Sequence, residues 1–203
     1  QLMMEVSDNM ATDTIARVVG LESVNAMLDS VGLANIRTAF DIGRWHHAIL
    51  GMADAERWPI GAAATEEERQ RRTDAELWDD ANPEGAYSAS DKNNVMSARD
   101  TVQLLQMLWS GALTETDAAR AEMLGWMRNC THTDTIGKYL AADVQAGLEN
   151  KYGGSRRIAS DVGIVHLPEG PDRPGGAVLI AAFAFAETAW VRRLGKERPD
   201  MTP

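Results

Sequence analysis

The order of the periodic segments predicts an α+β fold, with helices in the first two thirds of the chain and an antiparallel sheet at the end. Apolar residues recur with helical spacing over residues 10–32 and 97–129. Three β-rich segments separated by turn residues follow between residues 150 and 186. Hydrophobic residues make up 44% and charged residues 25% of the 203 residues, which is the composition of a globular domain.

The first two helices are marked by caps and glycine stops. Residues 10–19 carry apolar residues on one face and end at Gly20. Ser23 is of the residue type that caps a helix, and the second helix ends at Gly32.

Two further helices follow the middle of the chain. The sequence Ser97-Ala98-Arg99-Asp100 is a capping pattern that opens a Leu-rich helix, which ends near Ser110. Its apolar period directs Trp109 inward with the leucines. The last helix spans about 116–129 and places Met123 on its apolar face.

The sheet is predicted from three strands near the end of the chain: residues 150–156, 159–167 and 176–186. The last two strands are joined by the Pro- and Gly-rich segment 168–175, which favours an antiparallel meander. Between the two helical blocks, residues 35–94 change composition, with a highly charged stretch and an Asn-Pro turn signal. We expect this segment to be an insertion or lid-like excursion, helical in part.

The bulk composition excludes several classes of function. The net charge of −10 argues against a nucleic-acid or anionic-membrane surface, because both select for clustered Lys and Arg. The longest apolar run, residues 176–186, is too short to span a bilayer. Cys130 is the only cysteine, so no internal disulfide can form, and we expect a small buried hydrophobe. We predict neither a metal site nor a cofactor.

Two short motifs far apart in the chain carry the candidate chemistry. Ser7-Asp8-Asn9 supplies a hydroxyl and a carboxamide, and Lys151-Tyr152-Gly153 supplies a cation at the start of a strand. These are the parts needed to hold an amide-and-carboxylate ligand. Alone, the first motif is more often a helix cap and the second a strand entry; taken together, they favour a site.

The motifs and their order resemble class A serine β-lactamases and related penicillin-recognising hydrolases. The resemblance covers residues 2–33 and 95–186, and includes Asp161-Val162-Gly163-Ile164-Val165 on the next strand. It implies a three-layer α/β/α sandwich of the β-lactamase/transpeptidase type, in which an antiparallel sheet is flanked by helices. Residues 1–203 would form one partial domain that lacks its N-terminal part.

The resemblance also implies roles. Ser7 would pass a proton to the leaving nitrogen with Lys151 beside it, so both are candidate catalytic residues. Asp8 would tie the loop to the backbone. Substrate would be bound by the following residues: Asn9 through its side-chain amide, Tyr152, Gly153 through the space above it, Gly154 near the oxyanion, and Arg192 near the carboxylate.

Several departures from the family pattern bear on activity. No Ser-x-x-Lys occurs in the 203 residues, so the nucleophile would lie in a segment before Gln1 that completes the fold. Without that segment we expect the chain not to fold autonomously. Tyr152 replaces the usual Thr or Ser, and Asp161 stands about where the family places a carboxylate-binding Arg. No Glu-x-x-Leu-Asn follows Ala39, so the deacylating base is missing.

The leading hypothesis is therefore a serine hydrolase that acts on a β-lactam, amide or ester through an acyl-enzyme and is weak as a lactamase. The alternatives are a non-catalytic ligand-binding or sensor domain and a penicillin-binding D,D-peptidase. The altered Lys-x-Gly region and enlarged middle are similar to the lactamase-like members of clavulanic acid biosynthesis. The family resemblance implies export from the cytoplasm, whereas a biosynthetic relative would stay inside it.

Overall fold

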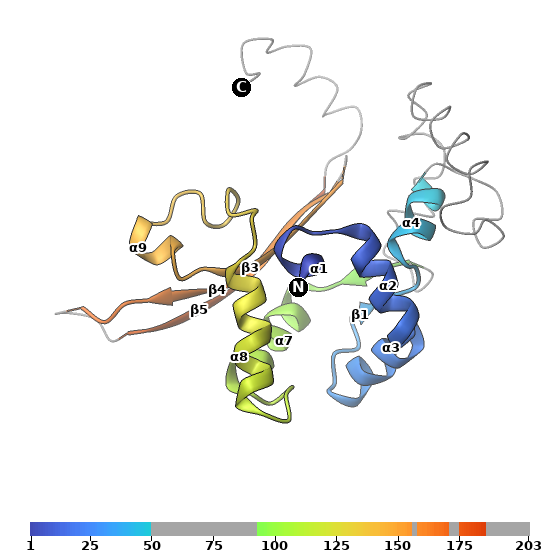
Figure 1. The fold of residues 1–203 in the computed structure, drawn as a ribbon, viewed down its shortest axis with the longest axis horizontal. Helices are drawn as coiled ribbons and strands as arrows, with labels where there is room; N and C mark the ends of the chain where they lie inside the picture. Colours follow the sequence, from blue (N-terminus) through green and yellow to red (C-terminus); the bar gives the residue numbers. More distant parts are fainter. Residues whose placement is uncertain (50–92, 156–157, 171–174, 186–203) are drawn as a thin grey trace, which may run out of the picture. The chain divides into compact units, whose positions relative to one another are not determined.

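The computed structural model describes residues 1–49, 93–155, 158–170 and 175–185 (Figure 1). These residues belong to two compact units. Unit 1 contains residues 1–7 and the chain from residue 101 onward, and unit 2 contains residues 8–100. Within the described ranges, no helix is long and apolar enough to cross a membrane.

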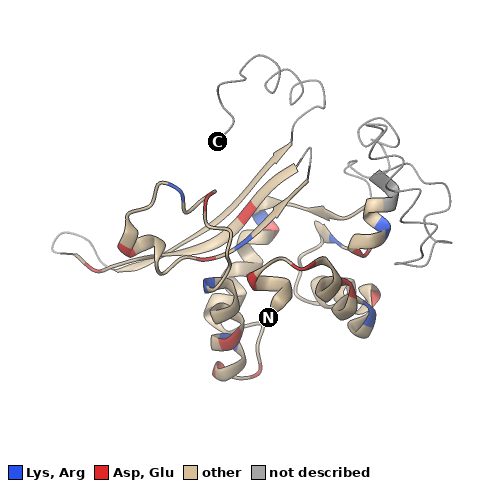
Figure 2. Ribbon diagram, turned by 45° about the horizontal axis from the view of Figure 1, so that its top comes forward, with Lys and Arg blue, Asp and Glu red and all other residues tan. Residues whose placement is uncertain are grey.

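Unit 1 is built on a three-stranded antiparallel sheet with the order β3-β4-β5. The strands are β3 (Glu149–Gly154), β4 (Ile158–Leu167) and β5 (Gly176–Phe185), which confirms the three predicted strands. Lys151 pairs with Val162 and Tyr152 pairs with Asp161. β5 contains no charged residue (Figure 2). Because side chains alternate along a strand, Lys151 and Tyr152 lie on opposite faces of this sheet.

Helices cover one face of the sheet. They are α1 (Leu2–Glu5), α7 (Ala98–Ser110), whose first turn belongs to unit 2, and α8 (Asp117–Arg128). The core consists of leucines of α7, a methionine of α8 and an isoleucine of β4: Leu105, Leu108, Met127 and Ile164. The Thr116 side chain caps α8 by accepting from the N–H of Ala119 at 3.1 Å.

Two side chains predicted to face the core do not. Trp109 is 44% exposed and Met123 is 38% exposed. In α8, Met127 is buried and Leu124 packs against the core cluster, so the inward face of the helix is rotated from the apolar stripe expected from the sequence. Trp109 is the penultimate residue of α7, where the helix passes the edge of the core cluster.

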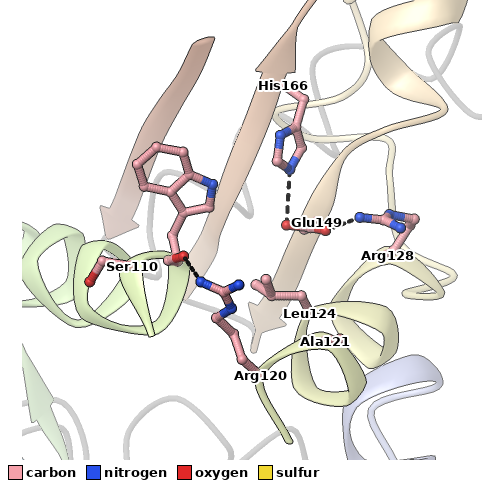
Figure 3. A pocket seen from close by; sticks show the side chains of 8 residues that line it. Ser110, Arg120, Ala121, Leu124, Arg128, Glu149 and His166 are labelled. Atoms are coloured by element: carbon pink, nitrogen blue, oxygen red, sulfur yellow. Dashed lines mark hydrogen bonds and ion pairs between the residues drawn. The ribbon is translucent and has the colours of Figure 1, made fainter. Parts of the chain in front are cut away.

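A buried carboxylate lies between α8 and the sheet (Figure 3). The Glu149 side chain is 1% exposed and accepts from the Arg128 guanidinium and from His166 Nε2, the latter at 3.0 Å. Both partners are themselves partly exposed. The pairing compensates a charge that would otherwise be costly to bury.

The other face of the sheet is covered by the segment that leads from α8 into β3 and contains α9 (Ala142–Gln145). Asn150 donates to the carbonyl of His132 at 2.8 Å and to Asp161 Oδ1 at 3.0 Å. A Cβ at Gly163 would lie 2.7 Å from the Glu149 carbonyl oxygen, so only glycine fits there. Within unit 1, the sheet therefore lies between two layers of chain, as expected for an α+β arrangement.

Unit 2 contains α2 (Asn9–Val19), α3 (Leu21–Ser30), α4 (Ile42–Ile49) and a two-stranded ladder of β1 (Ile36–Arg37) with β2 (Val95–Met96). The prediction that Ser23 caps the second helix is wrong. α3 begins at Leu21 because Gly20, at φ 83°, ends α2 and starts α3 in one residue.

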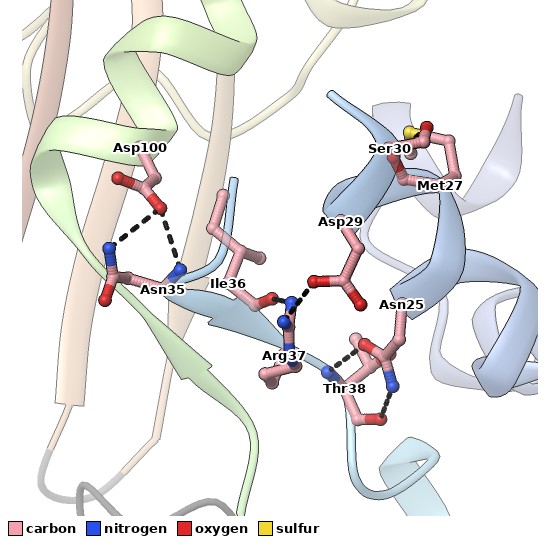
Figure 4. A network of polar contacts seen from close by, with 9 residues as sticks. All are labelled: Asn25, Met27, Asp29, Ser30, Asn35, Ile36, Arg37, Thr38 and Asp100. Carbon is pink, nitrogen blue, oxygen red and sulfur yellow. Dashed lines mark hydrogen bonds and ion pairs between the residues drawn. The ribbon is translucent and has the colours of Figure 1, made fainter. Parts of the chain in front are cut away.

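Asparagine and aspartate side chains hold unit 2 together (Figure 4). Asp100 accepts from the N–H and the side chain of Asn35, and the backbone bond of Asn35 lowers the pKa of Asp100. The side chain of Asn25 donates from Nδ2 to the carbonyl of Thr38 and accepts at Oδ1 from the N–H of Thr38. Asp13 is 2% exposed and accepts from the first N–H groups of α4. Because β1 and β2 have only two residues each, few backbone hydrogen bonds join them, and these side-chain hydrogen bonds add to the links within unit 2.

The two ends of the predicted insertion meet at this ladder. The N–H of Ser97 donates to the Asn35 carbonyl at 3.1 Å, and the N–H groups of Ala39 and Phe40 donate to Asn94 Oδ1. The insertion itself stays a prediction, since residues 50–92 lie outside the described residues.

Candidate active site around Ser7 and Lys151

The structure brings the hydroxyl of Ser7 and the ammonium of Lys151 together, although 144 positions separate them in the chain. Lys151 Nζ donates to Ser7 Oγ at 2.8 Å. Ser7 follows α1 closely and has φ 56°, a left-handed conformation that a non-glycine residue adopts at an energetic cost. Such local strain is typical of functional positions. The sequence motifs predicted this pair.

Ser7 is held in place by the end of α1. The carbonyl of Glu5 accepts from the N–H of Thr131 at 2.8 Å and from its hydroxyl at 3.1 Å. Asn129 Nδ2 donates to Glu5 Oε1 at 2.9 Å. The segment after α8 therefore fixes the chain two residues before Ser7, and nothing in the local sequence signals this anchoring.

The charge of Lys151 has neutral hydrogen-bond partners in the described part of the chain. Besides Ser7 Oγ, its Nζ donates to the carbonyl of Tyr152 at 2.5 Å. Burial lowers the pKa of Lys151, and the nearby Cys130 sulfur and Asp161 carboxylate partly oppose this effect. A partly buried ammonium whose hydrogen-bond partners are neutral attracts an anion and gives up a proton more readily than an exposed lysine.

Tyr152 and the two glycines after it form a packed surface. The Tyr152 ring stacks on the ring of His132, with centroids 5.3 Å apart and planes 12° apart. A Cβ at Gly154 would lie 2.2 Å from the Tyr152 hydroxyl oxygen, and a Cβ at Gly153 would lie 2.7 Å from Ser160 Oγ. A side chain at either glycine would thus have to displace a neighbouring side chain of the protein. The sequence motif did not point to His132.

Asp8 and Asn9 belong to unit 2. Asp8 Oδ1 accepts from the N–H of Ala11 at 2.6 Å, so its side chain caps α2. Asn9 is the first residue of α2 and is exposed. Arg192, the predicted carboxylate partner, lies outside the described residues.

Asp161 connects β4 to the segment that covers one face of the sheet. It is 2% exposed and accepts from the amide of Asn150, from the N–H of Ile136 at 3.2 Å, and from the hydroxyl of Thr135. These bonds fix the segment that covers the Tyr152 face of the sheet. Asn150 could have been found from its place beside Lys151, but no sequence signal marks Thr135.

The described residues contain no group of three His, Cys, Asp or Glu side chains placed to hold a metal ion. Cys130 is 4% exposed, and its sulfur lies 3.8 Å from the carbonyl oxygen of His132. This burial agrees with the expected small hydrophobe.

A family model described as "Beta-lactamase enzyme family" matches residues 1–188. Similar solved structures include a β-lactamase from Chitinophaga pinensis, 19% identical, at a TM-score of 0.59 over 98% of this chain and 63% of that chain. A β-lactamase from Sphaerobacter thermophilus is 18% identical, at a TM-score of 0.59 over 100% of this chain and 62% of the other.

The TLA-3 extended-spectrum β-lactamase is 19% identical, at a TM-score of 0.56 over 92% of this chain and 54% of that one. The chain thus spans 54% to 63% of the length of these structures. No curated protein matches it. The predicted α+β class and β-lactamase/transpeptidase-like fold are confirmed.

Proposed function

Because the chain belongs to the β-lactamase enzyme family, we propose that Ser7 and Lys151 form the proton-relay side of a serine hydrolase site. The reaction would be acyl transfer from a β-lactam, amide or ester through an acyl-enzyme. The observation that carries this proposal is the 2.8 Å hydrogen bond from the Lys151 ammonium to the Ser7 hydroxyl oxygen.

The direction of that hydrogen bond suits a relay. Lys151 donates into a lone pair of Ser7 Oγ, which leaves the hydroxyl hydrogen available to an acceptor outside the pair. When the acyl–nitrogen bond breaks, the leaving nitrogen takes the hydroxyl proton of Ser7. Ser7 Oγ then takes a proton from the Lys151 ammonium, whose lowered pKa favours the transfer.

The substrate would lie along β3. Among the described residues β3 pairs with β4 alone, so its other edge can accept an extended ligand. Gly153 and Gly154 would present their backbone there, Asn9 would donate its amide to the acyl-amide carbonyl, and Arg192 would meet the carboxylate. The proposed ligand is a small-molecule β-lactam, ester or peptide.

The nucleophile is proposed to come from a part of the protein beyond these 203 residues, since no Ser-x-x-Lys occurs within them. The absence of Glu-x-x-Leu-Asn supports slow hydrolysis of the acyl-enzyme, hence a weak lactamase or an esterase. A closer relation to the proteins of clavulanic acid biosynthesis stays a prediction.

A second candidate is a ligand-binding or sensor domain without catalysis. It is favoured by Tyr152, which replaces a small hydroxyl residue and whose ring lies against His132 and Gly154. A D,D-peptidase is a further possibility within the enzyme class.

The test uses the full-length protein and a fluorescent penicillin. We expect a covalent adduct in the mass spectrum that hydrolyses slowly. Ser7→Gly should lower the acylation rate about 100-fold or more while relieving the strained φ of Ser7, and Ser7→Ala should be equally slow. Ser30→Ala, which removes an exposed hydroxyl, serves as control.

No adduct, combined with no turnover of simple esters, would refute the enzyme. Saturable binding without an adduct would then support the binding domain.

A further inference from the structure

A cavity lies in unit 1, and its lining does not include Ser7 or Lys151 (Figure 3). Its volume is about 560 Å³, and it opens between the end of α7, α8 and the strands β3 and β4. Neither Ser7 nor Lys151 lines it. The lining side chains that matter here are aromatic, aliphatic or charged: Trp109, Arg120, Leu124, Arg128, Glu149 and His166.

The charges in this cavity favour an anion. Among the described residues that line it, Glu149 is the one carboxylate, and both its oxygens are engaged, with Arg128 and His166. The Arg128 side chain is 52% exposed, so part of its guanidinium faces open space. A guanidinium has five N–H donors, and among the described residues that of Arg128 is bonded to Glu149 alone.

Arg120 adds a second guanidinium in a fixed position. It donates to the carbonyl of Trp109 at 3.3 Å and pairs with Asp117 at 3.1 Å. Asp117 is 93% exposed, so water screens this pair and it neutralises little of the charge within the cavity. Arg120 also lies against Gly111, where φ is +85° and a Cβ would come within 3.4 Å of Nη1. The carbonyl of Trp109 and the carboxylate of Asp117 thus orient Arg120.

An apolar wall accompanies these donors. Trp109 lines the cavity and is 44% exposed, and Leu124 lies on the α8 side. A flat indole beside cationic donors is suited to a ligand with a planar ring and an oxyanion head.

We propose that this cavity binds a small aromatic oxyanion, in which a carboxylate or phosphate head pairs with Arg120 and Arg128 and the ring lies against Trp109. Guanidinium groups match both head groups through paired N–H bonds. Glu149 holds Arg128 in place. The two guanidinium groups outnumber this one carboxylate among the described residues that line the cavity, so the cavity would select an anion over a cation. This site is independent of the acyl-transfer proposal.

The test is calorimetric titration of the full-length protein with sodium benzoate and with phenyl phosphate. We expect saturable binding of at least one, and the tighter of the two identifies the head group. Acetate, which lacks the ring, and benzylamine, which reverses the charge, should bind at least tenfold more weakly. Arg120→Gln should weaken the binding about tenfold or more.

Three variants locate the binding within unit 1. Lys138→Gln removes one exposed positive charge away from the cavity and should leave the affinity unchanged. Lys151→Met should also leave it unchanged, because Lys151 does not line the cavity. Trp109→Leu should weaken benzoate binding several-fold, and it provides a second test if Arg120→Gln lowers the melting temperature.

The proposal is overturned by any of three results. The first is that neither anion binds saturably. The second is that benzylamine binds as tightly as benzoate. The third is that Lys151→Met abolishes the binding while Arg120→Gln and Trp109→Leu preserve it.

Discussion

Glu149 and Lys151 are two charged residues on the same face of β3, two positions apart, and the protein treats them differently. The side chain of Glu149 is 1% exposed and meets two basic partners, Arg128 and His166. Lys151 is partly buried and hydrogen-bonded to two neutral oxygens, those of Ser7 and Tyr152. One charge is compensated by bonded partners of opposite sign, and the other is not.

This difference indicates where chemistry can occur. A compensated buried charge can be kept because its partners replace the lost water. An ammonium without a bonded carboxylate lowers its pKa instead, and it retains attraction for an anion that arrives from outside. The burial of a charge alone would have ranked Glu149 above Lys151 as a candidate catalytic group. Because Glu149 is already paired with Arg128 and His166, Lys151 is the better candidate of the two.

The largest expected effect is on acylation by Lys151→Met. Removing the ammonium takes away the proton source and the positive charge beside Ser7, so we expect the acylation rate with a fluorescent penicillin to fall about 100-fold or more. The free energy of unfolding should stay within about 1 kcal/mol of the parent, since two hydrogen bonds are lost but a buried charge is removed. Lys138→Met is the matched control. An unchanged rate would show that the ammonium of Lys151 takes no part in acylation.

Glu149→Gln should act mainly on stability, whereas Lys151→Met acts mainly on the acylation rate. The bonds from Arg128 and His166 would lose their charged acceptor, which should lower the free energy of unfolding by about 2 kcal/mol. Urea denaturation measures this, with Glu122→Gln on the exposed side of α8 as control. If Glu149→Gln were as stable as Glu122→Gln, the carboxylate would not be compensated in the way described.

Gly154→Ala should have a smaller effect, localised to the Tyr152 side of the sheet. The new Cβ would displace the Tyr152 ring from His132, at a cost of about 1 kcal/mol. Loss of ring-current shifts at His132 in NMR spectra would report the displacement. Gly125→Ala is the opposite control, because a Cβ there meets nothing within 4 Å and alanine favours the helix. Unchanged His132 shifts in Gly154→Ala would contradict the packing.

The smallest expected effect is a pH dependence with a defined sign. Because the pKa of Lys151 is lowered in the folded protein, the unfolded chain binds more protons just below the ordinary lysine pKa of about 10.4. The parent should therefore gain stability relative to Lys151→Met as the pH rises through that window. Its acylation rate should decline over the same range. A parallel pH dependence of stability in parent and variant would show that the pKa is not lowered.

Local signals predicted much of the fold and the proximity of Ser7 to Lys151. Strand limits came from β-rich segments, and Ser7 and Lys151 came from motifs that fold into the expected elements. The start of α3 was missed because Gly20 serves two helices at once. Such a shared residue leaves no separate cap in the sequence.

The remaining misses concern contacts between distant segments. The exposure of Trp109, the stacking of His132 on Tyr152 and the partners of Glu149 depend on how α7, α8 and the sheet meet. The spacing of apolar residues and the composition are properties of a single helix or strand. They therefore identify the apolar face of that element but not the segment that packs against it. Asn9 and Arg192 stay predictions of the family resemblance.

The anchoring of Glu5 by Thr131, and of Ser7 by Lys151, has a consequence for biosynthesis. Glu5 and Ser7 leave the ribosome long before Thr131 and Lys151, which follow more than 120 positions later, so they lack these partners during translation. Contacts of such long sequence separation slow folding and expose a nascent chain to aggregation. We therefore expect penicillin acylation to appear only after β3 has been synthesised, which stalled ribosome–nascent chain complexes of increasing length can show.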